Sequence, residues 1–295
     1  MAILALLQYY RLRIFVFFIR LLLIKRGPIP VAPDNVLQIP SRDQNRTIKA
    51  HIYRPIKAKT PSPVLINLHG SGFVLPVHGE DDFYCRYVSN NSTYTVFDVQ
   101  YRLAPENPFP APLHDVEDVV RYIQSRPDEY DASQMSIGGF SAGANLSLSA
   151  SSMMLPRDTF RSVIAFYPPA EMAGLPENKT PPDASGHRIP PFLARTFDSA
   201  YFQNTDPCDP RISPFYAPAE QFPASMYIVT PAQDYLADEG AELAGRIRRE
   251  GGGKYVLHKR VEGCGHGWDK HPKKGSHEER MREEAYQMAV EILKR

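Results

Sequence analysis

The sequence contains little cysteine, a single tryptophan and almost no net charge. The three cysteines, Cys85, Cys208 and Cys264, form no C-x-x-C pair, so neither a disulfide framework nor a zinc site is indicated. With 34 Lys and Arg against 33 Asp and Glu, the formal charge of +1 does not indicate a nucleic-acid partner. We therefore expect no metal ion and no nucleic acid, and a small neutral molecule as the partner.

A long uninterrupted apolar run is also missing, although the N-terminus is strongly apolar. Arg11, Arg13 and Arg20 interrupt residues 1–26, so no stretch approaches the roughly 20 clean residues that span a bilayer. These charges lie in the apolar centre that a secretory signal peptide keeps uninterrupted. Two alternatives remain: a helix packed on the protein's own body, or a helix lying in a membrane face with its arginines reaching the headgroups.

The abundance of Phe, Leu and Ile in residues 1–26 favours the membrane contact. This predicts an intracellular protein at the endoplasmic reticulum or another membrane face, with the cytoplasm as the alternative. The rest of the composition is typical of a globular protein, with 43% hydrophobic and 23% charged residues over a length of 295. Nothing in these counts indicates an oligomeric state.

Strand-like and helix-like segments alternate along most of the chain. Short apolar runs typical of buried strands cover 63–70, 94–99, 135–140, 162–168, 225–230 and 254–261. Helical patterns cover 112–126, 142–154, 237–250 and 276–294. This alternation predicts an α/β fold with a mostly parallel central sheet and helices on both faces. Residues 47–53 alternate apolar and polar side chains, which predicts an antiparallel strand at the edge of the sheet.

One segment interrupts the alternation. Residues 171–213 are rich in Pro, Asp and Asn and contain a single helical stretch, "RIPPFLARTFDSAYF". A long insertion between two core strands is usually functional or disordered. It would lie over the carboxyl ends of the strands, where open α/β sheets bind ligands, so we expect it to form part of a lid.

The strongest chemical motif is Gly-x-Ser-x-Gly, formed by Gly139, Phe140, Ser141, Ala142 and Gly143. Between a strand and a helix this spacing is typical of a nucleophile elbow, in which a strained turn presents the serine hydroxyl above the sheet. The alternative is a tight turn whose serine caps the following helix.

A serine nucleophile needs a base and a group that orients the base. His266 lies in the glycine-rich stretch "VEGCGHGWDK" just past the last predicted strand, and Asp234 follows the strand that ends at Thr230. Their order after Ser141 is the one that α/β-hydrolases use. Asp238 is the rival carboxylate, but it lies where an acidic residue would favour the start of a helix.

Acyl transfer also needs donors for the developing oxyanion. Gly70, Ser71 and Gly72 follow a predicted strand in "LHGSGF", where backbone N–H groups can be left free, and the N–H of Ala142 would complete the set. His69 is expected to be structural and to hold the backbone of this loop by a hydrogen bond. The loop lacks the third glycine and the helix start of a dinucleotide fingerprint, so we expect no nucleotide cofactor.

With these residues in place, the chain resembles the hormone-sensitive-lipase-like (GDXG) branch of the α/β-hydrolases. The resemblance extends from about residue 63 to the C-terminus and is carried by "HGSGF", "YRLAPENPFPAPLHD", "GFSAGANL", "QDYLADEG" and "GCGHGW". It implies Ser141, Asp234 and His266 as the triad, with Ser71 and Gly72 in the oxyanion hole. It also implies a structural role for the tyrosine-arginine block, which would brace the oxyanion loop and the elbow.

The resemblance further implies a helical cap over the catalytic domain. The cap would consist of residues 1–40 and the insertion at about 171–213, with the catalytic domain at 41–295. Two positions depart from the family pattern, since Ser71 stands where the family has a glycine and Phe140 stands where this branch usually has an aspartate.

These residues predict a serine carboxylesterase that cleaves short, acetyl-like esters of a small organic molecule through an acyl-enzyme intermediate, without a cofactor. The preference for short acyl groups comes from the resemblance alone. Two alternatives on the same fold are a ligand-binding receptor without turnover and a lyase that uses the same pocket for elimination.

Overall fold

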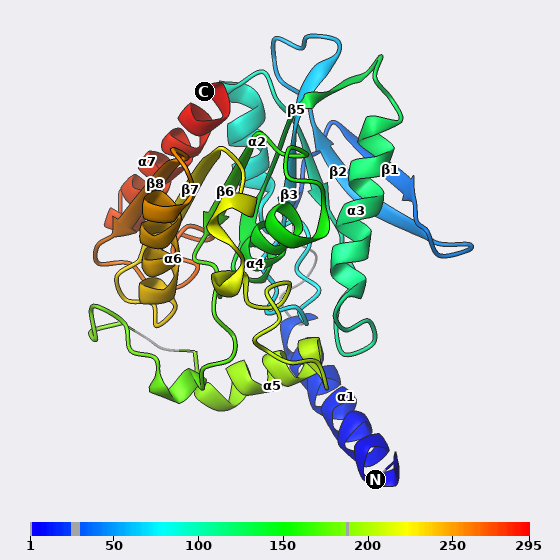
Figure 1. Ribbon diagram of the computed structural model, residues 1–295, viewed down its shortest axis with the longest axis vertical. Coiled ribbons are helices and arrows are strands. Elements are labelled where there is room, and N and C mark those ends of the chain that lie inside the picture. The colour runs from blue at the N-terminus through cyan, green and yellow to red at the C-terminus, as the bar shows by residue number, and fades with distance from the viewer. Residues whose placement is uncertain (1, 25–29, 187–188) are drawn as a thin grey trace.

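A mixed eight-stranded sheet forms the centre of the protein (Figure 1). The computed structural model describes residues 2–24, 30–186 and 189–295. The strands are β1 (Asn35–Pro40), β2 (Thr47–Tyr53), β3 (Ser62–Leu68), β4 (Thr95–Val99), β5 (Tyr130–Phe140), β6 (Ser162–Phe166), β7 (Ser225–Pro231) and β8 (Tyr255–Val261). Their order is β1-β2-β4-β3-β5-β6-β7-β8, and all neighbours from β4 to β8 pair in parallel. The predicted mostly parallel α/β sheet is confirmed.

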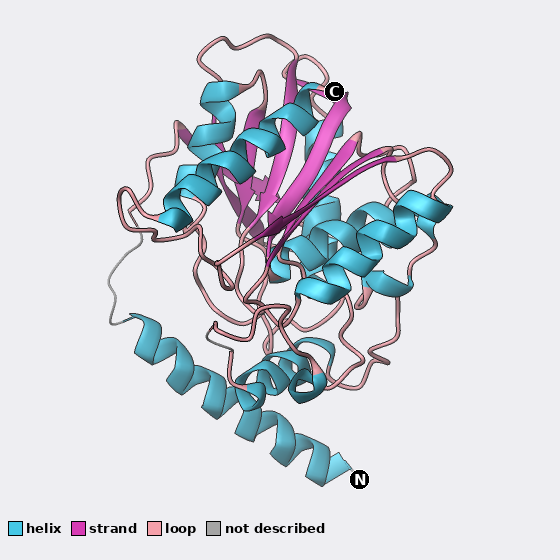
Figure 2. Cartoon of the chain, turned by 90° about the vertical axis from the view of Figure 1, so that its left-hand side faces the viewer, coloured by secondary structure: helices cyan, strands magenta, loops and turns pink. Residues whose placement is uncertain are grey.

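Helices cover both faces of this sheet (Figure 2). They are α1 (Ala2–Ile24), α2 (Asp82–Asn91), α3 (Ala111–Gln124), α4 (Ala142–Ser149), α5 (Pro191–Phe202), α6 (Ala237–Glu250) and α7 (His277–Lys294). One apolar cluster packs α3, α4 and α6 against one face, and a second packs α2 and α7 against the other. In β3, Val64 and Ile66 belong to the first cluster and Leu65 to the second, as the period of two in a strand requires.

The edge of the sheet differs from the prediction. Residues 47–53 form an antiparallel strand, as expected, but β2 lies between β1 and β4, and β1 is the edge. Only Ile39 is buried in β1, so the strand carries almost no apolar alternation by which its sequence could be recognised. The helix α2 was not predicted either. Its buried apolar side chains, Tyr84, Cys85 and Val88, cover little more than one turn, so they form no long periodic pattern.

The helix α1 crosses one end of the molecule beside α5 (Figures 1 and 2). Val16 is fully buried against the body. The guanidinium of Arg20 donates hydrogen bonds to the carbonyl oxygens of Val74 (3.0 Å) and Ala104 (2.6 Å) and to Glu106 Oε1 (3.0 Å). The outer face of α1 exposes Tyr10, Ile14, Phe15, Phe17, Phe18, Leu21 and Leu22. Among the helices of the described residues, none has both the length and the hydropathy needed to span a bilayer.

The end of β3 lies against the turn between β5 and α4. A Cβ atom added at Gly143 would lie 1.9 Å from the carbonyl oxygen of Leu68, and one added at Gly139 would lie 2.4 Å from the same atom. Both distances are far inside van der Waals contact, so only glycine allows the strand and the helix to approach this closely. The loop that leaves β3 is therefore held beside the turn that carries Ser141.

We expect Gly143→Ala to destabilise the protein by about 3 kcal/mol, because its methyl group meets a backbone oxygen that cannot move aside without shifting β3. Urea unfolding followed by circular dichroism measures the change. Gly245→Ala is the matched control, since it lies in α6 and meets only the flexible end of Arg249. There alanine should be neutral or stabilise by up to about 1 kcal/mol. Equal stabilities of the two variants would contradict the steric interpretation.

Candidate active site

Ser141 occupies the turn between β5 and α4 with φ of 50° and ψ of −118°. A non-glycine residue with positive φ is strained and is retained only where its surroundings hold it. Here the Ser141 N–H donates to the carbonyl oxygen of Phe166 in β6 (2.9 Å), and its own carbonyl accepts from the Asn145 N–H (3.0 Å). The side chain is half-buried, so the hydroxyl stays accessible.

The structure brings Ser141, His266 and Asp234 together from three separate loops. His266 Nε2 lies 2.9 Å from Ser141 Oγ, and His266 Nδ1 lies 2.6 Å from Asp234 Oδ2. Asp234 is buried, and its other carboxylate oxygen accepts the Leu236 N–H at 3.1 Å. The rival Asp238 lies in the first turn of α6, where its carboxylate is 3.8 Å from Arg260 instead.

The loop after β3 reaches the same place. A Cβ atom added at Gly70 would lie 3.6 Å from Ser141 Cβ, and Gly72 has φ of +54°. In the described part of the chain, no carbonyl accepts a hydrogen bond from the N–H of Gly72 or of Ala142. Two free donors therefore border the serine hydroxyl.

Tyr101, from the tyrosine-arginine block, holds this loop in place. The Tyr101 hydroxyl donates to the carbonyl oxygen of His69 (2.6 Å) and accepts from the Ser71 hydroxyl (2.7 Å), which in turn accepts the Phe73 N–H (2.9 Å). The His69 ring stacks on Tyr101 with centroids 4.4 Å apart, and His69 Nδ1 lies 3.1 Å from the carbonyl oxygen of Gly70. The Ser71 side chain thus points into this network, and its N–H is left for other partners.

A largely buried lysine lies behind the elbow, with 13% of its side chain exposed. Lys270 Nζ contacts Asp81 Oδ1 at 2.6 Å and Asp269 Oδ2 at 3.1 Å, and it lies 3.1 Å from the centre of the Phe140 ring. Burial raises the pKa of Asp81 to about 6, although Lys270 opposes this shift. Burial would lower the pKa of Lys270, but Asp269 and Asp81 together raise it above its usual value. The ammonium is therefore a fixed charge under the residue that precedes the nucleophile.

The same network reaches His266. Asp269 accepts hydrogen bonds from the hydroxyls of Tyr167 (2.7 Å) and Tyr286 (2.6 Å). The Tyr167 ring lies 4.6 Å from the His266 ring, centre to centre. Because His266 and Lys270 belong to one loop, the buried charges anchor the loop that carries the imidazole. The sequence does not mark Lys270, which lies in a polar stretch with two further lysines.

One group in the described residues has the composition of a metal site. His51, His78 and Asp98 bring one ligand atom each within 4.8 Å of one another. His78 Nε2 lies 3.2 Å from Asp98 Oδ2 and 3.0 Å from the carbonyl oxygen of the same residue. Burial would shift both groups toward their neutral forms, yet the pKa of His78 is raised and that of Asp98 is lowered, as each stabilises the charge of the other. We interpret the pair as an ion pair behind the loop that follows β3.

A small pocket opens at Ser141, with a cavity volume of about 60 Å³. Its wall combines the loop after β3, the elbow, the segment after β6, the helix α5 and the start of α6. The side chains and backbone that line it are those of Gly72, Phe73, Ser141, Ala142, Pro169, Glu171, Met172, Gly174, Pro176, Lys179, Ile189, Ala194, Phe197, Asp198, Tyr235 and Leu236. Residues of the 171–213 insertion therefore share one pocket with the predicted nucleophile.

Two carboxyl groups, Asp198 in the pocket wall and Glu239 behind it, have raised pKa values. Burial raises the pKa of Asp198 to about 7, with Lys179 opposing the shift. Burial also raises the pKa of Glu239, in α6, to about 7, although Lys179 is its ion-pair partner at 2.5 Å. Perturbed carboxyl groups in a cleft are typical of functional sites. The sequence marked neither residue.

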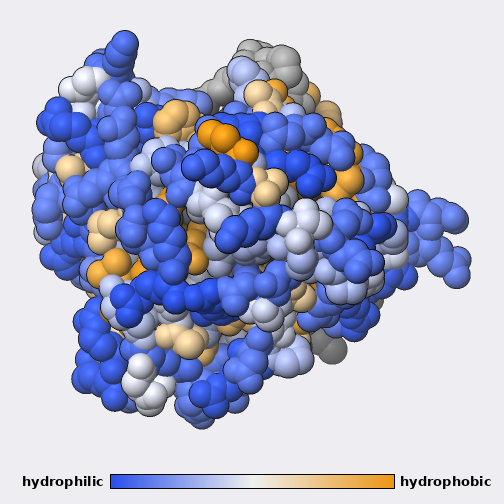
Figure 3. All heavy atoms as spheres, turned by 90° about the horizontal axis from the view of Figure 1, so that it is seen from above, coloured by the Kyte–Doolittle hydropathy of each residue, from blue (hydrophilic) through white to orange (hydrophobic). Residues whose placement is uncertain are grey.

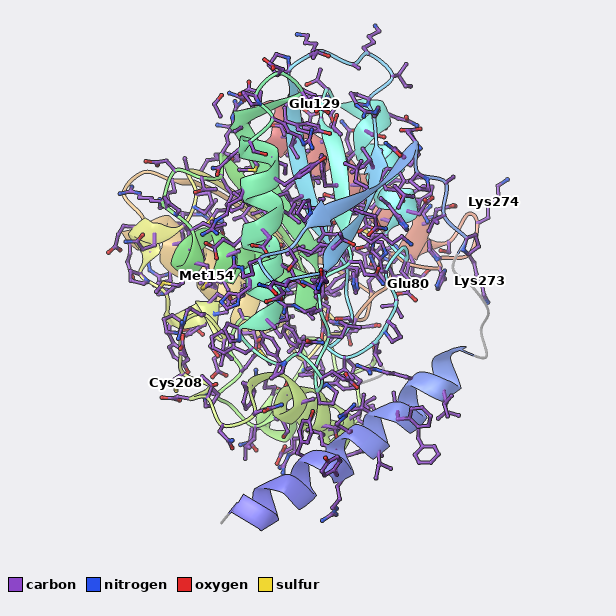
Figure 4. The ribbon with its side chains drawn as sticks, turned by 90° about the vertical axis from the view of Figure 1, so that its right-hand side faces the viewer. Glu80, Glu129, Met154, Cys208, Lys273 and Lys274 are labelled. Carbon is purple, nitrogen blue, oxygen red and sulfur yellow. The ribbon has the colours of Figure 1, made fainter. Side chains whose placement is uncertain are left out.

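We expect Lys270→Met to destabilise the protein by about 3 kcal/mol or more, because it leaves the buried carboxylates of Asp81 and Asp269 without their cation. Urea unfolding measures the loss. Lys274→Met is the matched control, since Lys274 points away from the body (Figure 4) and has no ion-pair partner among the described residues. A Lys270→Met protein as stable as the control would show that the buried charges are compensated in another way.

The chain is similar in sequence to known hydrolases. A family model described as alpha/beta hydrolase fold matches residues 65–270, which is more than half of the chain. The chain is 30% identical over 216 residues to the carboxylic ester hydrolase LipN of Mycobacterium tuberculosis, covering 69% of this chain and 57% of LipN. It is 27% identical over 228 residues to an arylesterase of Saccharolobus solfataricus, covering 75% of this chain and 73% of that enzyme.

Solved structures give the same result at the level of the whole fold. A hyperthermophilic esterase from Pyrobaculum calidifontis superposes with a TM-score of 0.77 at 28% identity, covering 97% of this chain and 93% of that one. The carboxylesterase EstE1 from a metagenomic library also gives 0.77 at 28% identity, with 97% of both chains covered. The chain therefore belongs to the hormone-sensitive-lipase-like (GDXG) family of the alpha/beta hydrolase fold.

Proposed function

We propose that this protein is a serine carboxylesterase that acts through an acyl-enzyme intermediate. The observation that supports it most directly is the hydrogen-bonded series from Ser141 Oγ through His266 to the buried Asp234, at the mouth of a pocket. A hydroxyl next to an imidazole, which is itself oriented by a carboxylate, is the arrangement that activates serine at neutral pH. The names of the relatives, which are ester hydrolases, support the same reaction class.

In this mechanism Ser141 Oγ attacks the ester carbonyl while His266 Nε2 accepts its proton. Asp234 Oδ2 accepts the hydrogen bond from His266 Nδ1–H and stabilises the imidazolium. The N–H groups of Ser71, Gly72 and Ala142 donate to the oxyanion that forms on the carbonyl oxygen. The imidazolium then protonates the leaving alcohol, the C–O bond of the ester breaks, and the acyl group stays on Ser141.

Water completes the cycle. His266 Nε2 removes a proton from a water molecule, whose oxygen attacks the acyl carbon, and the proton returns to Ser141 as the acid leaves. The same three N–H groups stabilise the second oxyanion.

We propose a preference for short acyl groups, because the cavity at Ser141 is small and Phe73, Met172 and Phe197 narrow it. Each methylene group of the acyl chain that does not fit the pocket lowers kcat/KM, because the acyl chain must then extend into solvent or push the lining side chains aside.

The test is hydrolysis of p-nitrophenyl acetate, butyrate, octanoate and palmitate by the purified full chain. We expect kcat/KM to fall from acetate or butyrate to palmitate, and Ser141→Ala to lower kcat by roughly a thousandfold or more on every ester. The exposed Ser133→Ala is the matched control and should keep wild-type rates. Wild-type turnover by Ser141→Ala would refute the mechanism, and saturable ester binding without turnover would favour a receptor.

We also propose that residues 1–40 and 171–213 form a cap over the catalytic domain at 41–295, and that the cap contacts a membrane. The support for the cap is that α1 and α5 lie side by side and that α5 lines the pocket. The support for membrane contact is the apolar outer face of α1, flanked by the exposed cations Arg11 and Arg13. Aromatic and aliphatic side chains with flanking arginines suit the interface of an anionic bilayer.

The end of the molecule opposite α1 has a more polar surface than the outer face of α1. Viewed from that end, the surface is mostly hydrophilic, with apolar side chains scattered singly or in small groups (Figure 3). A contiguous exposed apolar stripe on one helix is unusual for a surface that meets only water. A bilayer contact at α1 would place the pocket close to the membrane face.

We expect the double variant Phe18→Glu, Leu22→Glu to lose binding to vesicles of mixed phosphatidylcholine and phosphatidylglycerol, because two carboxylates would enter the apolar face that meets the lipid. Co-sedimentation of the full chain with the vesicles measures the bound fraction. Ile56→Glu is the matched control, since Ile56 is 77% exposed outside α1. A wild-type chain that stays in the supernatant, or a dimer in light scattering that the double variant abolishes, would overturn the membrane proposal.

A further inference from the structure

The pocket at Ser141 has a charged wall. Of the described residues that line it, three carry ionisable groups of the acidic or basic type: Glu171, Lys179 and Asp198. They come from the 171–213 insertion, two from the loop after β6 and one from α5. Glu239 stands behind them in α6. Three carboxyl groups therefore surround one lysine.

Lys179 forms ion pairs with two of these carboxylates. Lys179 Nζ contacts Glu239 Oε2 at 2.5 Å, lies 3.5 Å from Glu171 Oε2 and also donates to the carbonyl oxygen of Glu171. Glu239 Oε1 in turn accepts the N–H groups of Ala170 (2.7 Å) and Glu171 (3.2 Å). The positive charge is thus shared within this cluster.

Glu171 is likewise satisfied by the protein. Its Oε1 atom accepts hydrogen bonds from the Ala173 N–H (2.8 Å), the Gly174 N–H (2.9 Å) and the Tyr216 hydroxyl (2.9 Å). These donors and Lys179 hold the pKa of Glu171 below its usual value, although burial opposes them. Its carboxylate is fixed in the ionised form.

Asp198 is different. It lines the pocket, and within the described residues it has neither a hydrogen bond nor an ion pair. Asp198 is half-buried, and a carboxyl group in such a wall is stabilised when a donor or a cation approaches it. Nearby, Phe73, Phe197 and Tyr235 line the same pocket with aromatic rings, whose faces attract cations. Among the described residues this wall therefore has a carboxyl group without an ion pair or a hydrogen bond, next to aromatic rings, and a bound cation would hold that carboxyl group in its ionised form.

We propose that Asp198 is a specificity-determining residue that binds a protonated amine of the substrate, so that the preferred esters of this enzyme carry a basic amine. The amine N–H donates to the Asp198 carboxylate while the ester carbonyl lies at Ser141. The inference rests on the proposed esterase function and deepens it by assigning a substrate class. It also differs from the small neutral molecule that the overall charge of the chain indicated.

Two pairs of esters with the same shape test the inference. In the first, 2-(dimethylamino)ethyl acetate is compared with 3-methylbutyl acetate, so the amine lies on the alcohol side. In the second, ethyl 3-(dimethylamino)propanoate is compared with ethyl 4-methylpentanoate, so the amine lies on the acyl side. In each pair a protonated N–H replaces a C–H at neutral pH. The readout is the ratio of kcat/KM for the cationic ester to that for the neutral ester, measured with the purified full chain.

We expect the wild-type ratio to exceed one in at least one pair, and Asp198→Asn to lower that ratio by about tenfold or more, as for the loss of a charged hydrogen bond. Asp158→Asn is the matched control, because it removes the same charge from an exposed position outside the pocket. It should leave the ratio unchanged. Separate kcat and KM values show whether the amine acts in binding or in the transition state.

The outcomes are distinct. If neither neutral ester nor p-nitrophenyl acetate is hydrolysed, the proposed esterase function fails. If neutral esters are hydrolysed but neither pair favours the cation, the esterase function stands and the role of Asp198 is overturned. A ratio that stays the same in Asp198→Asn, with both rates lowered together, would also overturn it, because the residue would then support only the structure of α5.

Discussion

The site depends on one close approach between backbones. The carbonyl oxygen of Leu68 lies where side chains at Gly139 and Gly143 would be, so the end of β3 and the turn after β5 are locked together. This contact places the loop after β3 beside Ser141 and sets the free N–H groups next to the hydroxyl. The positive φ of Ser141 costs about 1 to 3 kcal/mol by itself, and the hydrogen bond of its N–H to β6 helps to hold it.

A second constraint is electrostatic. Phe140 stands where this branch of the family usually has an aspartate. The Lys270 ammonium lies over the Phe140 ring. The negative charges that neutralise Lys270 come instead from Asp81, just before α2, and from Asp269, in the loop of His266. A largely buried cation with two carboxylates and an aromatic face is well compensated. The arrangement ties the loop of His266 to the elbow through charge rather than through regular secondary structure.

Local patterns predicted most of this molecule and failed where the determining contacts are long-range. The core strands and the helices α3, α6 and α7 follow from apolar periodicity, and the residues around Ser141 follow from turn chemistry and chain order. The strand β1 was missed because only Ile39 is buried, so pairing with β2 defines it. Lys270 could not be recognised in the sequence, because its partner Asp81 is distant along the chain. Asp198 could not be recognised either, because the pocket that it lines forms only when distant segments pack together.

The net charge of the chain does not describe the charges in the pocket at Ser141. The whole chain is nearly neutral, which favoured a neutral ligand, but 34 basic and 33 acidic residues are mostly spread over a wet surface where each is screened. Inside the pocket the dielectric constant is low, so a few groups dominate. There Lys179 forms ion pairs with Glu239 and Glu171, whereas Asp198 has no ion pair or hydrogen bond among the described residues. The ligand meets this local excess and not the sum over the chain, so the pocket can favour a cation in a protein with almost no net charge.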